Sequence, residues 1–92
     1  MIPGKFLIPY WVKFDIQNYD FAGITLSKVG YGVTAFDKYD AFDILKREAF
    51  KNKQLPTVIE IIENVSFDYL DAGHVVPNMG VIVERGVWFP NI

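Results

Sequence analysis

The chain has 92 residues, of which eleven are acidic and nine are basic, so its formal net charge is −2. Typical domains contain roughly 100 to 150 residues, and we therefore expect a single domain over residues 1–92. The charge balance argues against a nucleic-acid partner, and the lack of cysteine excludes disulfides, thiol nucleophiles and cysteine-ligated metals.

The first eleven residues, Met1 to Trp11, carry no basic start and no small-residue cleavage site. No apolar run in the chain approaches the roughly 18 residues that a membrane span needs. We therefore expect no export signal and no membrane partner, and we expect a cytoplasmic location.

Apolar and polar residues alternate from Phe6 to Ile16, which predicts a half-buried first strand. A second β-rich stretch runs to Phe36, with Tyr31, Val33 and Ala35 on one face. Gly30 and Gly32 are unusual inside a strand. They indicate a bulge or a place where another backbone or a ligand comes close, and the bulge is the favoured interpretation.

A helix is predicted to start at Asp37, because this side chain can accept the N–H of Asp40 while Asp40 reaches back as in a capping box. Both charges also complement the helix dipole. The buried stripe of this helix is expected to consist of Ala41, Ile44, Leu45 and Ala49. Asn52 and then Pro56 end the helix.

Residues 57–65 fit both a helical and a strand period, and their β-branched side chains favour a strand. Ser66 is predicted to cap a single turn through Leu70. The alternation of Val81 to Phe89 predicts the last strand. Arg85 shares its side of this strand with valines.

The sequence therefore predicts an α+β fold in the order ββαββ, with an antiparallel sheet of about four strands and one main helix on one face. A ferredoxin-like variant is the alternative, although that fold requires a second helix. One helix covers only one face of such a sheet, and Trp11, Phe36 and Trp88 fall on the other. We expect that face to be covered by a second copy of the chain or by another protein.

Candidate binding residues gather in the last third of the chain: Asp71, His74, Asn78, Arg85 and Trp88. His74 and Asp71 could form a general-base dyad, but a turn in which Asp71 caps and His74 bonds backbone is the favoured interpretation. His74 is the only histidine and no carboxylate lies at ligand spacing from it, so we expect neither a metal nor a cofactor.

The other three candidates also have structural interpretations. Asn78 precedes Met79-Gly80 and is typical of a turn. Arg85 suggests an internal ion pair with an aspartate or, less favoured, the anion-binding residue of a pocket. Trp88 suits core packing and an exposed anchor for a partner equally well.

Two stretches resemble a family of small bacterial proteins that have no assigned function. The first is Tyr31-Gly32-Val33-Thr34-Ala35-Phe36 followed by Asp40-Ala41-Phe42-Asp43-Ile44-Leu45. The second is His74-Val75-Val76-Pro77-Asn78-Met79-Gly80 with Arg85-Gly86-Val87-Trp88-Phe89-Pro90. The resemblance implies a bacterial cytoplasmic protein and implies no activity.

No nucleophile elbow and no glycine-rich phosphate loop is present in the sequence, which favours a protein without enzymatic activity. The leading hypothesis is a binding or protein-interaction module that self-associates. The alternatives are a small enzyme or ligand pocket around Asp71, His74 and Arg85, and an inhibitor or immunity protein.

Overall fold

A computed structural model describes residues 6–24, 26–70, 73, 75 and 79–90. Its strands are β1 (Ile8–Phe14), β2 (Tyr31–Ala35), β3 (Val58–Glu63) and β4 (Gly86–Phe89). Its helices are α1 (Lys38–Ile44), the π-helical continuation η1 (Leu45–Ala49) and the 3₁₀ turn η2 (Phe67–Tyr69). The predicted α+β class, with an antiparallel sheet and one main helix, is confirmed.

The sheet order is β3-β1-β2-β4, so β1 lies in the interior and pairs with β2 on one side and β3 on the other. This order differs from the order along the chain, because β3 returns to β1 after the helix instead of pairing with β4. The strand predicted over residues 57–65 from their β-branched side chains is confirmed over Val58–Glu63.

The helix side of the sheet holds the larger core. The predicted faces are confirmed: Tyr10, Val12 and Phe14 of β1 pack there with alternate residues of β2. The buried stripe of the helix meets them, and it consists of Ala41, Ile44, Leu45 and Ala49. The last turn widens to a π-helix, in which the Phe50 N–H donates to the Leu45 carbonyl at 2.9 Å.

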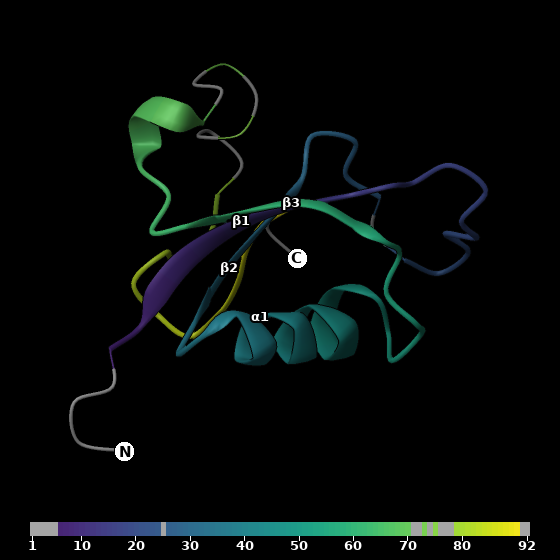
Figure 1. The fold of residues 1–92 in the computed structure, drawn as a ribbon, viewed down its shortest axis with the longest axis horizontal. Helices are drawn as coiled ribbons and strands as arrows, with labels where there is room; N and C mark the ends of the chain where they lie inside the picture. The colour runs from purple at the N-terminus through teal and green to yellow at the C-terminus, as the bar shows by residue number, and fades with distance from the viewer. Residues whose placement is uncertain (1–5, 25, 71–72, 74, 76–78, 91–92) are drawn as a thin grey trace.

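The opposite face is covered by the chain itself, which corrects the expectation that another molecule must cover it. Figure 1 shows α1 on one side of the sheet and the segment that contains η2 on the other. Trp11 and Trp88 lie under this segment with ring centroids 5.9 Å apart. The residues packed around them are Ile62, Val65, Leu70, Val75, Met79, Ile82 and Phe89.

The predicted last strand from Val81 is too long, because Ile82–Arg85 form turns and bends and only Gly86–Phe89 pair with β2. The Thr34 hydroxyl donates to the Ile82 carbonyl at 2.5 Å. This bond holds the residues around Ile82 against the face of the sheet, so they do not extend β4. The first strand and the second β-rich stretch are also shorter than expected, at seven and five residues.

Candidate functional site

Arg85 forms an ion pair with Asp40, which confirms the favoured interpretation of this residue. Its Nε donates to Asp40 Oδ2 at 2.9 Å and its second guanidinium nitrogen donates to Oδ1 at 2.5 Å. The guanidinium also lies over the Phe36 ring, 5.6 Å from its centroid. Arg85 reaches Asp40 from the turn before β4 and not from within a strand.

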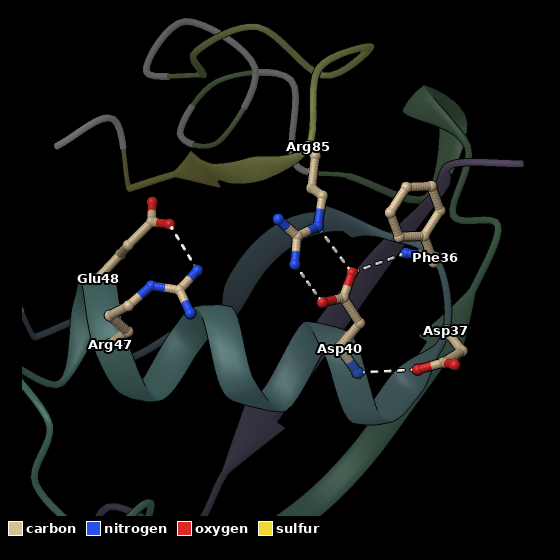
Figure 2. Close-up of polar contacts among 6 residues, drawn as sticks. All are labelled: Phe36, Asp37, Asp40, Arg47, Glu48 and Arg85. Atoms are coloured by element: carbon tan, nitrogen blue, oxygen red, sulfur yellow. Dashed lines mark hydrogen bonds and ion pairs between the residues drawn. The ribbon is translucent and has the colours of Figure 1, made fainter. Parts of the chain in front are cut away.

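Asp40 holds the start of α1 as well as Arg85, as Figure 2 shows. Its amide donates to Asp37 Oδ1 at 2.8 Å, which is the predicted N-cap. Its Oδ2 accepts from the Phe36 N–H at 3.0 Å, one residue before the position that a capping-box glutamate reaches. The side chain of Asp40 is only 17% exposed, whereas that of Arg85 is 44% exposed.

The charge of Asp40 is favoured by these contacts. The hydrogen bond from Arg85, followed by that from the Phe36 amide, holds the pKa of the Asp40 carboxyl below its ordinary value against the opposing effect of burial. Two of the guanidinium nitrogens of Arg85 are thereby occupied by a carboxylate of the same chain. The ion pair therefore joins the turn before β4 to the helix, and Arg85 does not form an open anion site.

Trp88 belongs to the core. Its side chain is fully buried, and the two-versus-one register shift opposite Gly32 lets Trp88 and Phe89 both join the cluster around Trp11. This shift and the close approach of the Trp88 ring to Gly32 together explain the glycine that the sequence singled out. The Trp88 Nε1 has no hydrogen-bond partner among the described residues.

The candidate residues Asp71, His74 and Asn78 lie outside the described residues. Of the candidate set, the structure thus places Arg85 in the turn before β4 and Trp88 in the core under the segment that contains η2. Among the residues that the structure describes, no group of three or more acidic or histidine side chains could hold a metal ion.

Two features that the candidate set missed lie at and beside β3. This strand is at the edge of the sheet, and none of its six residues is buried. Beside it lie two hollows that share Lys13 and Val29, and the smaller of them is on the tryptophan face. In the sequence, Glu60 and Glu63 indicate that β3 is incompletely buried, because a strand with both faces covered has little room for charge.

Within the described part of the chain, no helix has the length and apolar character required to cross a lipid bilayer. Comparisons with protein-family models, curated proteins and solved structures gave no match for this chain. The resemblance to a family of small bacterial proteins therefore stays a prediction.

Proposed function

We propose that the protein is a non-enzymatic interaction module that self-associates, and that it does so by pairing β3 with β3 of a second copy. The observation that supports this proposal is the open outer edge of β3. The strand pairs with β1 on its inner side, and no strand of the described chain pairs with its outer side. An edge of this kind presents N–H and C=O groups to any incoming strand.

The side chains of β3 suit strand addition better than those of the other edge. Val58 is 36% exposed and Ile59 is 66% exposed, so apolar surface accompanies the open backbone. The edge strand β4 has only four residues, and Trp88 and Phe89 of these are buried. β3 contains no lysine or proline, which are the residues that often protect an edge strand.

A second copy fits this edge without opposing like charges. Antiparallel pairing about a two-fold axis centred on Ile61 places Ile61 opposite its own equivalent, Glu60 opposite Ile62, and Ile59 opposite Glu63. Lys13 of β1 lies 3.5 Å from Glu60 within each copy and balances that carboxylate. The two sheets would then form one continuous eight-stranded sheet.

This register makes a charge-dependent prediction at Ile59. Ile59→Glu places a carboxylate opposite Glu63 of the second copy at two symmetric positions, and we expect the dimer dissociation constant to rise about tenfold. Ile59→Lys places an ammonium group there and should keep or strengthen the dimer. Sedimentation velocity over a concentration series measures both effects.

The matched control is Val83→Glu, because Val83 is 76% exposed and lies outside β3. It should leave the dissociation constant unchanged. A strict monomer at high concentration, or equal loss of association in Val83→Glu and Ile59→Glu, contradicts the proposal. Equal weakening by Ile59→Glu and Ile59→Lys contradicts the register.

A further inference from the structure

The two hollows that share Lys13 and Val29 form a site with different chemistry in its two parts. The smaller hollow has a volume of about 170 Å³ and is lined by Trp11, Lys13, Val29, Tyr69, Leu70 and Val75. The larger has a volume of about 290 Å³ and is lined by Lys13, Phe14, Ser27, Lys28, Val29, Gly30 and Ile59. The smaller part is mainly apolar, and the larger part has two lysines at its wall.

The wall of the larger hollow is held by hydrogen bonds within the loop before β2. Ser27 Oγ accepts the Gly30 N–H at 3.3 Å, and the Ser27 N–H donates to the Tyr31 hydroxyl at 3.1 Å. Gly30 lets this loop lie directly against the indole of Trp11, because a Cβ there would come within 2.8 Å of the ring. The two hollows share Lys13 and Val29, and these contacts hold in place the loop that borders them.

The charge at this site is positive, in contrast to the net negative charge of the chain. Lys13 is partly balanced by Glu60, and its ammonium lies 5.9 Å from the centroid of the Tyr69 ring. Contact with the Tyr69 hydroxyl, and then the charge of Glu60, raises the pKa of Lys13, so this group stays protonated at neutral pH. Lys28 has no ion-pair partner in the part of the chain that the structure describes.

From this arrangement we infer that the groove binds a small alkyl monocarboxylate, with its carboxylate between Lys13 and Lys28 and its apolar body over Trp11. The smaller hollow, at about 170 Å³ with a mainly apolar lining, suits a short alkyl chain. A lysine ammonium binds a carboxylate by a charge-assisted hydrogen bond.

Calorimetric titration with hexanoate tests this inference, with hexanol and hexylammonium as probes of the same chain length. We expect saturable one-to-one binding of hexanoate, binding of hexanol at least about tenfold weaker, and no binding of hexylammonium. Equal binding of hexanoate and hexanol would overturn the inference. So would the lack of saturable hexanoate binding up to tens of millimolar.

Lys28→Met provides the residue-level test, because Lys28 is exposed and its replacement leaves the core intact. We expect hexanoate binding to weaken about tenfold while the free energy of unfolding stays the same. Lys51→Met is the matched control, since Lys51 is an exposed lysine after the helix, and it should bind like the wild type. Unchanged binding in Lys28→Met, or equal loss in both variants, overturns the inference.

The association proposed for β3 is measured separately on the same samples by sedimentation. A chain that stays monomeric and binds hexanoate contradicts the proposed function and supports the site. A chain that dimerises and does not bind hexanoate supports the proposed function and contradicts the binding site.

Discussion

Gly30, directly before β2, and Gly32, within β2, leave room for the rings of Trp11 and Trp88. A Cβ at Gly30 would come within 2.8 Å of the Trp11 ring, and one at Gly32 would come to 2.5 Å from Cε3 and Cη2 of Trp88. Real Cβ atoms do not approach other atoms so closely, and the indole rings are themselves closely packed. The packing of Trp11 and Trp88, on the face of the sheet away from the helix, therefore requires these two glycines.

Gly32→Ala should lower the free energy of unfolding by about 1–3 kcal/mol, because the added methyl group would overlap the fully buried Trp88 ring. Urea denaturation followed by circular dichroism measures this loss. Its control is a double-mutant cycle with Trp88→Leu. In the Trp88→Leu background, Gly32→Ala should cost far less, and strictly additive effects would contradict the assigned contact.

At the scale of the element, the start of α1 links three parts of the chain. Asp37 caps the helix, Asp40 accepts the Phe36 amide, and Arg85 joins Asp40 from a turn 45 residues further along the chain. Local capping alone would fix only the end of the helix. The added ion pair fixes the position of the helix relative to the turn before β4.

The depressed pKa of Asp40 predicts a pH dependence of stability. The pKa is lower in the folded state than the unfolded value of about 3.9, so the ionised carboxyl stabilises the fold above that pH and loses this effect as the pH falls through the folded pKa. Asp40→Asn should therefore lower the free energy of unfolding at pH 7. The difference from the wild type should shrink below about pH 4.

Urea denaturation of Asp40→Asn and of the wild type between pH 2 and pH 7 measures this dependence. Asp43→Asn is the control, because Asp43 is exposed on the same helix. Its pH profile should stay close to that of the wild type. A constant difference between Asp40→Asn and the wild type at all pH values would show that the charge of Asp40 is not the cause.

At the scale of the whole molecule, the segment between β3 and β4 provides the third layer, although its described residues form just one short turn of helix, η2. It is attached to the sheet at separate points. The Thr34 hydroxyl donates to the Ile82 carbonyl, and the Gly80 N–H donates to the Trp88 carbonyl at 2.6 Å. The apolar side chains of this segment that shield the tryptophans are Val65, Leu70, Val75, Met79 and Ile82.

Thr34→Val should weaken this attachment, because it removes the hydroxyl but keeps the shape of the side chain. We expect the free energy of unfolding to fall by about 1 kcal/mol, with an additional loss if the Ile82 carbonyl remains without a partner. Tryptophan fluorescence should shift to the red in the folded state, and the segment should be cleaved faster by proteases.

Thr57→Val is the control, since Thr57 is exposed just before β3. It should change neither the fluorescence nor the rate of cleavage. Unchanged fluorescence in Thr34→Val, with the stability of the wild type, would contradict a role for this hydrogen bond in holding the segment.

Much of the fold could be predicted because it is encoded locally. The cap at Asp37, the buried stripe of the helix and the alternation along β1 each depend on residues that are close in the sequence. The sheet order could not be predicted, because several pairing orders bury the same faces. The cover over the tryptophans was also missed, since Val65, Leu70 and Val75 follow no helical or strand period.

The candidate site was predictable only in part. The partner of Arg85 was expected to be an aspartate because a carboxylate and a guanidinium are complementary, and Asp40 is that partner. Glu60 and Glu63 indicate incomplete burial of this strand, but its place at the edge depends on the sheet order, which the sequence does not specify. The groove depends on a loop that brings Lys28 beside Lys13, and loop placement has no signal in a single sequence.

The interior position of β1 affects the accuracy with which the sheet assembles. Its residues contribute alternately to two packed layers, with Val12 toward the helix and Trp11 toward the opposite cover. A slip by one residue would turn every side chain over and place the ammonium of Lys13 beneath the helix, where it would lose water without gaining Glu60. Errors in strand alignment are thus opposed from both sides of the sheet at once.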